Sequence, residues 1–356
     1  YPLYMTYGIY RRILDAEYHK KDETPSIEDQ RKIWDKVIAD NIFVLCKTPM
    51  AKSITKRTLA GFREAKVNTR YFEDLVNQIT HKQQNFLNKV KQGKTYWKSN
   101  NNDDMKFNAI VGNPPYQEMD GGAGVSAKPV YNHFVTISKK IKPNYISMIT
   151  PSRWFAGGKG LDDFREEMLK DNRLSKIVDF VNAKDCFPNT SIGGGINYFL
   201  WDSEHKAECE FSYVHDGVVD KMQRNLNEFQ IFIRYNKAVD IIHKTNTKDI
   251  KKLSSIVSSR NPFGLSSNTR GKSKKFENSI SLYTSDGLSY IPKEDVDSKN
   301  QYLQTYKIMI SKVTSEHAGE PDKNGMFKIL SRTELINPFE VCTDSYLIIG
   351  SFEKKD

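Results

Sequence analysis

The sequence has little cysteine and no long apolar run, and each absence excludes a class of protein. Its four cysteines, Cys46, Cys186, Cys209 and Cys342, lie far apart, and no Cys-x-x-Cys pair of a zinc site occurs. This spacing argues against a disulfide framework or a metal site, and we expect free thiols in a reducing cytoplasm. No apolar run approaches the roughly 18 residues that a membrane-spanning helix needs, so no membrane partner is expected.

The chain also lacks a secretion signal and an initiator methionine. It starts with Tyr-Pro-Leu-Tyr-Met-Thr-Tyr, which has no basic leader followed by an apolar core. We therefore expect a fragment or a processed product. The 356 residues, 38% hydrophobic and 12% aromatic, are enough for two folded domains. The formal net charge of +10 favours a polyanionic partner.

Strand-like and helix-like segments alternate over the first two thirds of the chain. Ser26, followed by acidic residues, predicts a helix start, and residues 131–141 have the apolar spacing of a helix. We expect a mainly parallel sheet covered on both faces, which is an α/β fold. The expected strands are residues 41–46, 107–111, 145–150, 174–181 and 196–201, with 209–214 as a hairpin-like partner of the last, and the expected helices include 9–14, 50–62 and one that opens at 161.

Two glycine-rich segments each allow two interpretations. Residues 120–126 and 157–160 could cradle a phosphate, but no Gly-Lys-Ser/Thr follows the first. We interpret the first as a mobile loop and the second as a tight turn into a helix. The Asn-rich residues 100–104 are expected to form a surface loop.

The stretch from Phe107 to Tyr116 is the strongest functional signal. A short apolar run ends in Asn113-Pro114-Pro115-Tyr116. Both prolines lack an amide hydrogen and fix φ, so the backbone can neither continue a strand ladder nor begin a helix. A stiff loop is the ordinary meaning of Pro-Pro. Here the carboxamide, the outward carbonyls and the adjacent ring together suit a planar heterocycle that bears an amino group.

The composition changes from about residue 245. Residues 250–276 contain seven basic residues and no acid, and they are rich in Ser, Gly and Asn. A solvated basic face is the usual meaning of such a run, but it is also typical of a segment that contacts a phosphate backbone. We predict a domain boundary between residues 245 and 246. The residues that we predict to bind DNA are Arg260, Arg270, Lys272, Lys274 and Lys275.

The string Asn113–Tyr116 resembles motif IV of the methyltransferases that modify the exocyclic amine of adenine. The order of features from Ile42 to Phe199 is similar to that of the TaqI-like adenine methyltransferases of type II restriction–modification systems, which include chains that combine methylation and cleavage. The matching pieces are residues 107–116, the helix with Tyr131 and Phe134, and residues 149–154 and 185–188, while residues 329–334 and 341–344 are similar to a specificity region.

The resemblance implies a fold, a cofactor and a partner. Residues 1–245 would form a Rossmann-like class I methyltransferase domain, truncated at its N-terminus, and residues 246–356 the start of a mixed α+β target-recognition domain. The methyl donor would be S-adenosylmethionine, and the partner would be double-stranded DNA from which the adenine is flipped out.

The resemblance also assigns roles to residues. The Asn113 side chain and the Pro114 carbonyl would accept hydrogen bonds from the adenine amine, within a catalytic set that includes Pro115 and Tyr116. Tyr116 would stack on the base, and Phe187 would pack from another side.

The sequence departs from this family at the cofactor site. An Asp-Pro-x-x-Gly-x-Gly-like loop is normal in the family, but none occurs between Tyr1 and Asn113, and the resemblance implies that it lay just before Tyr1. The acid that would hold the cofactor ribose falls at Cys46 or Lys47, and Asn108 stands where Asp is common. Cofactor-binding residues are therefore left unassigned, and no nuclease pattern of paired acids with Glu-x-Lys is found.

Three functions remain open at this point. The first is transfer of a methyl group to the N6 amine of adenine in DNA, within a restriction–modification system. The second keeps the chemistry but moves it to RNA or to a protein glutamine. The third is a DNA-binding specificity module on a degenerate methyltransferase scaffold, suggested by the missing glycine loop and by Cys46.

Overall fold

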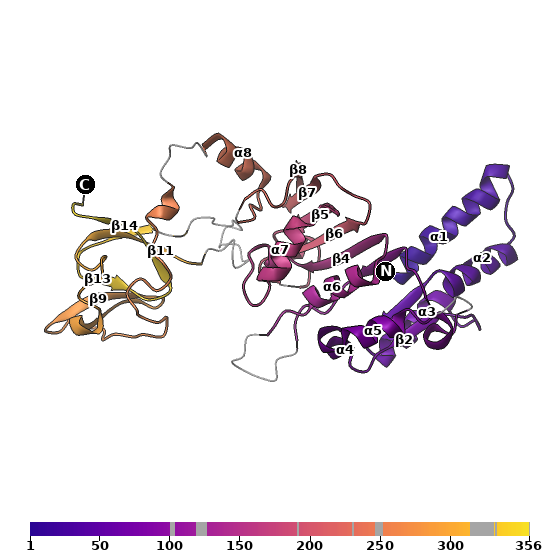
Figure 1. The fold of residues 1–356 in the computed structure, drawn as a ribbon, viewed down its shortest axis with the longest axis horizontal. Helices are drawn as coiled ribbons and strands as arrows, with labels where there is room; N and C mark the ends of the chain where they lie inside the picture. The colour runs from indigo at the N-terminus through magenta and orange to yellow at the C-terminus, as the bar shows by residue number, and fades with distance from the viewer. Residues whose placement is uncertain are drawn as a thin grey trace. The chain divides into compact units, whose positions relative to one another are not determined.

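The computed structural model is a mixed α/β protein that divides into two compact units (Figure 1). It describes residues 1–99, 104–118, 127–190, 192–229, 231–245, 252–313, 331 and 333–355. The first unit comprises Tyr1–Asp179, Asn197–Ser212 and Lys221–Phe232, and the second comprises Phe180–Ile196, Tyr213–Asp220 and Ile233–Asp356. The predictions for some residues cannot be compared with the structure, because these residues lie outside the described part of the chain: 100–103, 120–126, 251, 329, 330 and 332.

Three helices at the N-terminus pack around one apolar core. They are α1 (Pro2–Glu17), α2 (Ile27–Asp40) and α3 (Pro49–Ala60). Ser26 caps α2 as predicted, because its hydroxyl accepts a hydrogen bond from the Asp29 N–H at 3.1 Å. Such a cap stabilises a helix by about 1 kcal/mol. The shared core includes Leu14, Val37, Ile38 and Leu59.

A two-stranded parallel sheet follows these helices. Strand β1 (Phe43–Cys46) pairs with β2 (Asn68–Tyr71), with Phe43 opposite Asn68. The buried Asn68 carboxamide donates to the carbonyls of Ala39 and Ile42 and thereby ties β2 to the end of α2. Helices α4 (Leu75–His81) and α5 (Gln83–Val90) and a five-residue π-helix, η2 (Gly93–Trp97), complete this part.

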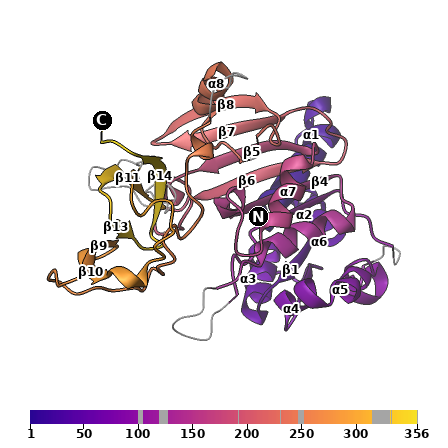
Figure 2. The ribbon, with the colours of Figure 1, turned by 60° about the vertical axis from the view of Figure 1, so that its left-hand side comes forward.

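The larger sheet has six strands in the order β3-β4-β6-β5-β7-β8 (Figure 2). Helix α6 (Tyr131–Ile141) packs on β4, and its predicted bounds are confirmed. Helix α7 (Asp162–Lys170) lies beside the strands of this sheet (Figures 1 and 2). The strands are β3 (Ala109–Gly112), β4 (Tyr145–Pro151), β5 (Leu174–Phe180), β6 (Ile196–Asp202), β7 (Cys209–His215) and β8 (Val218–Arg224).

The larger sheet is mixed, so the expectation of a mainly parallel sheet is wrong. Strands β3 and β4 are parallel, with Gly112 opposite Met148. Strand β6 runs the other way beside β4, because Ser203 N–H donates to the Asn144 carbonyl while Asn197 bonds the Thr150 carbonyl farther along. Between β5 and β6 the described residues contain only a short 3-10 helix, η4 (Ala183–Asp185), and without a long crossover the returning strand is antiparallel.

The expected pairing of residues 209–214 with 196–201 is also wrong. Strand β7 lies between β5 and β8, not beside β6. The connection from β7 to β8 is only Asp216 and Gly217, whose φ angles are 49° and 76°. Two consecutive positive φ values form the tight turn that the twist of a β-hairpin prefers, so β8 takes the place beside β7.

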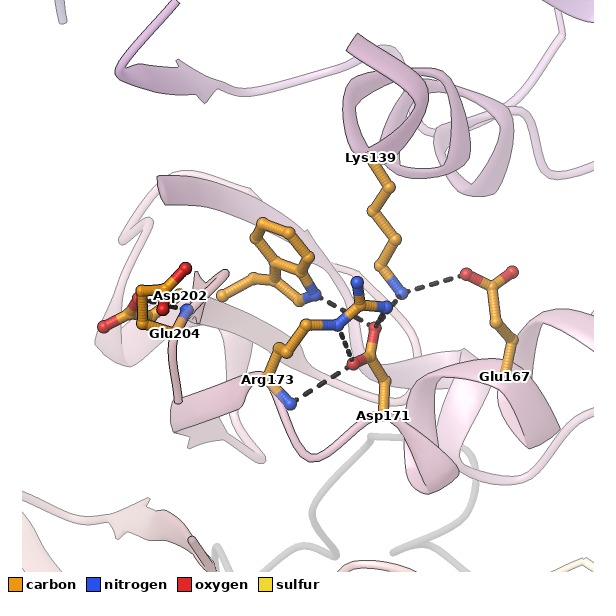
Figure 3. A network of polar contacts seen from close by, with 7 residues as sticks. Lys139, Glu167, Asp171, Arg173, Asp202 and Glu204 are labelled. Atoms are coloured by element: carbon orange, nitrogen blue, oxygen red, sulfur yellow. Dashed lines mark hydrogen bonds and ion pairs between the residues drawn. The ribbon is translucent and has the colours of Figure 1, made fainter. Parts of the chain in front are cut away.

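A charged cluster stands at the edge of this sheet where β5 begins (Figure 3). The Asp171 carboxylate, with a side chain only 6% exposed, accepts from Lys139 Nζ at 2.9 Å and Arg173 Nε at 2.7 Å. It also accepts from Trp201 Nε1 at 2.9 Å, and Lys139 in turn bonds Glu167. These contacts tie α6, α7, β5 and β6 together.

The second unit contains two three-stranded sheets that share a core. Strand orders are β10-β9-β13 and β12-β11-β14, and the core includes Leu282, Met309 and Ile348. The Lys307 ammonium is buried, donates to the Thr305 and Asn337 carbonyls, and has its pKa lowered to about 8 by burial. The elements are α8 (Asn236–Thr245), β9 (Ser279–Thr284), β10 (Gly287–Pro292), β11 (Tyr306–Ser311), β12 (Thr333–Ile336), β13 (Glu340–Cys342) and β14 (Tyr346–Phe352).

None of the helices in the described part of the chain is both long enough and apolar enough to cross a membrane.

Candidate active site

Residues 113–116 leave the carboxyl end of β3, where ligands of α/β sheets bind. Asn113 is exposed, Pro114 is buried, and Pro115 and Tyr116 are half-buried. The backbone of these four residues is neither strand nor helix, as the two prolines dictate. Asn113 is therefore exposed between the end of β3 and the two stiff prolines that follow it.

The segment after Asn113 is fastened to the start of α6. The Tyr116 carbonyl accepts a hydrogen bond from the Val130 N–H at 3.2 Å, and the Lys128 carbonyl accepts one from the Glu118 N–H at 3.0 Å. Gln117 and Pro129 form an isolated antiparallel bridge between these two bonds. Because Tyr131 opens α6, the position of Tyr116 is coupled to the first turn of that helix.

A cavity of about 400 Å³ lies next to the loop. Its walls are apolar and come from β1, from β3 with Asn113 and Pro114, and from α5 and α6. Strands β1 and β3 belong to different sheets, and both contribute residues to the lining. Of the described residues that line the cavity, only Lys47 has a charged side chain, and none is acidic.

Cys46 ends β1 at the position that the resemblance assigns to a ribose-binding acid. The thiol is buried, and its Sγ lies 3.8 Å from the Thr55 hydroxyl oxygen. Burial raises the pKa of this thiol, so it stays neutral near pH 7. A neutral thiol and an ammonium group cannot accept the hydrogen bonds of two ribose hydroxyls. The described lining thus fits the apolar parts of a nucleoside sulfonium donor, and it offers no acid for its ribose.

A buried polar network, which the sequence reading missed, lies at the same edge of the sheet as Asn113. The Ser152 hydroxyl donates to Asp179 Oδ1 at 2.6 Å, and Asn197 Nδ2 donates to Ser152 Oγ at 3.2 Å. Asn197 Nδ2 also reaches the Thr150 carbonyl at 3.3 Å. All four residues are at most 3% exposed. A polar residue inside an apolar run, as in Ile196-Asn197-Tyr198-Phe199, was the available signal.

Phe187, the predicted second stacking ring, belongs to the second unit. It is half-buried, and its N–H donates to the Ala183 carbonyl at 2.8 Å. Its role at the base remains a prediction.

The basic segment meets acids that are distant in sequence. Arg260 bonds Asp344 through Nε and Nη2, Lys312 bonds the same carboxylate at 2.6 Å, and Arg270 Nε lies 2.8 Å from Asp286. Hydrogen bonds from Arg260 and Lys312 lower the pKa of Asp344 to about 2. The lysines among the predicted DNA-binding residues, Lys272, Lys274 and Lys275, are exposed.

In the part of the chain that the structure describes, no group of three or more His, Cys, Asp or Glu side chains could hold a metal ion.

Comparisons with known proteins match part of this sequence to a family. Residues 40–187 match the model of the Eco57I restriction-modification methylase family. A Mycoplasma pneumoniae protein described as an uncharacterized adenine-specific methylase is 31% identical over 173 residues, which are 45% of this chain and 41% of that relative. The resemblance to restriction–modification methylases is therefore confirmed for this segment, and the TaqI-like subclass remains a prediction.

The chain spans less than half the length of the proteins that it resembles. A nuclease-deletion mutant of the Type ISP restriction-modification enzyme LlaGI, with a DNA substrate mimic, is 10% identical with a TM-score of 0.48, over 98% of this chain and 38% of that one. The Type IIL enzyme MmeI, in complex with DNA, is 8% identical with a TM-score of 0.43, over 85% of this chain and 46% of that one.

Proposed function

We propose that the chain is part of a DNA methyltransferase that modifies the N6 amine of adenine in a restriction–modification system. One observation carries this proposal: Asn113-Pro114-Pro115-Tyr116 stands at the carboxyl end of β3, beside an apolar cavity, within the residues that match a restriction–modification methylase. The domain division at residue 245 and the roles of the predicted site residues belong to the same proposal.

Asn113 and Pro114 act on the acceptor base. The adenine amine is a weak nucleophile because its lone pair is delocalised into the ring. Hydrogen bonds from its two N–H groups to the Asn113 carboxamide oxygen and the Pro114 carbonyl localise that lone pair on the nitrogen, and the same bonds fix its direction. S-adenosylmethionine, when bound, supplies an electrophilic methyl group. The exposure of Asn113 leaves its carboxamide accessible to an incoming base.

Tyr116 and Phe187 receive the flipped base. Extrusion of a base from the duplex costs a few kcal/mol. Stacking on an aromatic ring offsets about 1–3 kcal/mol of that cost. Tyr116 is suited to this role because its backbone is fastened to α6 through Val130, so the backbone that carries the ring is already ordered when the base arrives.

Lys272, Lys274 and Lys275 contact the phosphate backbone in this proposal. They are exposed on the second unit, and Lys272 Nζ lies 4.6 Å from the centre of the Phe276 ring. Arg260 and Arg270 also contribute, although each first has to share or leave the carboxylate that it bonds in the free protein.

Methyl transfer from labelled S-adenosylmethionine to unmethylated bacterial DNA tests the proposal. Asn113→Ala removes one of the two acceptors, and we expect transfer to fall by about 100-fold or more, by analogy with the loss of one oriented hydrogen-bonding group elsewhere. Asn172→Ala is the matched control, since Asn172 is exposed and borders β5 at the opposite edge of the sheet. Undiminished transfer by the Asn113 variant contradicts the mechanism.

A second function is favoured by the cavity. Its described lining has no acid, and Cys46 stands where a ribose-binding acid is expected. We therefore keep the alternative that this chain is a DNA-binding specificity module on a degenerate methyltransferase scaffold. Calorimetric titration with S-adenosylmethionine separates the two: micromolar binding excludes the degenerate scaffold, and absence of heat up to millimolar donor supports it.

A further inference from the structure

We propose that Ser152, Asp179 and Asn197 are positioning residues that hold the loop Asn113–Tyr116 in place. The inference rests on the proposed function, because it deepens the account of that same site. The three side chains form one hydrogen-bonded chain at the edge of the sheet where β3, β4 and β5 end and β6 begins. None of them lines the cavity beside the loop, so their effect on the base is indirect.

The chain has a defined direction. Asp179 accepts the Ser152 proton, which turns a lone pair of the Ser152 oxygen toward Asn197 Nδ2. The same Asn197 amide nitrogen lies 3.3 Å from the Thr150 carbonyl. Each bond therefore fixes the geometry of the next, and the result is a fixed end of β4.

The first route from this network to the loop is the β3–β4 ladder. Gly112, the last residue of β3, is opposite Met148, and Thr150 lies two residues beyond Met148. The carbonyl that Asn197 holds is thus level with the backbone that follows Gly112, where Asn113 and Pro114 lie. A shift of the β4 end is transmitted to these residues because paired strands move together.

The second route passes through aromatic side chains to Tyr116. Ser152 opens a short 3-10 helix, η3 (Ser152–Phe155), which carries the fully buried Trp154. The Trp154 and Phe164 rings are 5.9 Å apart, and the Phe164 and Tyr131 rings are 6.2 Å apart. Tyr131 follows Val130, whose N–H bonds the Tyr116 carbonyl.

The polar side chains of the network indicate a positioning role and not packing alone. Three apolar side chains would fill the same volume without the cost of removing polar groups from water. Hydrogen bonds differ from apolar contacts in that they fix direction, and this network fixes it at the base of the proposed site.

Hydrogen exchange of the whole chain tests the coupling without any need for catalysis. We expect amides of residues 113–118 and 127–131 to exchange about tenfold faster in Ser152→Ala and Asp179→Ala than in the wild type. Asp179→Asn keeps an acceptor for Ser152, so exchange should rise less than in Asp179→Ala. Asp171→Asn is the matched control at the opposite edge, and it should leave these two segments unchanged. Ser152→Ala removes one oxygen and keeps the test valid if Asp179→Ala does not fold.

Wild-type exchange at these segments in folded Ser152→Ala overturns the inference, as does an equal acceleration along the whole sheet. Asp179→Asn as damaging as Asp179→Ala also overturns it, because only Asp179→Asn keeps an acceptor for Ser152.

Methyl transfer gives the second measurement. In Ser152→Ala we expect kcat to fall about tenfold while KM for DNA changes less than about twofold, since DNA contacts are untouched. An unchanged kcat overturns the catalytic part. If the wild-type chain transfers no methyl group, the proposed function fails, whereas the exchange result still decides whether the network positions the loop.

Discussion

Two buried aspartates at opposite ends of β5 are held in different ways. Asp171, just before the strand, is bonded by two cationic side chains and an indole N–H (Figure 3). Asp179, the second-last residue of the strand, accepts from the Ser152 hydroxyl. That hydroxyl is bonded in turn to the Asn197 carboxamide. The first arrangement joins helices to the sheet, whereas the second orients the backbone beside the proposed site.

Charge stabilises the carboxylate at the start of β5. Cations at Asp171 offset the desolvation of its carboxylate, and they lower its pKa well below the usual range despite the opposing effect of burial. At the other end of the strand, the Ser152 hydroxyl and the Asn197 carboxamide give the network its direction.

Removal of the Asp171 carboxylate should have the largest effect on stability. Asp171→Ala leaves Lys139, whose side chain is only 10% exposed, without one of its two carboxylates. Breaking such a buried pair costs about 2–4 kcal/mol of unfolding free energy. Urea unfolding followed by circular dichroism measures it. The comparison fails if Asp171→Ala is no less stable than Ser152→Ala.

The pH dependence of stability sharpens the same comparison. The folded-state pKa of Asp171 is lowered, so its contribution is present above the unfolded value near 3.9 and is lost as pH falls toward the folded value. We expect the wild type to lose at least about 1 kcal/mol more than Asp171→Asn between pH 5 and pH 3. Thermal unfolding across this range provides the measurement, and parallel curves for the two proteins would refute the assignment.

The smallest effect on stability is expected at the other end of the strand. Ser152→Ala removes a neutral hydrogen bond in a buried site, which costs about 1–2 kcal/mol. Its loss of methyl transfer should nevertheless exceed that of Asp171→Ala when both are assayed well below their unfolding temperatures. A reversed order would mean that the cluster around Asp171, not the network of Ser152, Asp179 and Asn197, sets the geometry of the loop.

Much of the local structure could be predicted from the sequence. The capping hydroxyl of Ser26, the bounds of α6 and the end of β3 at the two prolines all depend on neighbours within four residues. The direction and order of strands could not, because β6 and β7 are placed by contacts with strands that lie far away in the chain.

The predicted site divides in the same way. Asn113–Tyr116 could be found in the sequence because its functional groups come from consecutive residues. The network of Ser152, Asp179 and Asn197 was missed because its members are 27 and 45 residues apart. The basic segment has no acid in its sequence, yet its Arg260 meets Asp344 across 84 residues.

The sequence by itself determined the chemistry offered to the base, since two prolines and an asparagine constrain their own backbone wherever they lie. The tertiary structure alone decided what holds that chemistry in place. Hydrogen bonds and ion pairs between distant residues depend on distances of about 3 Å. Only the completed sheet and its packed helices create those distances.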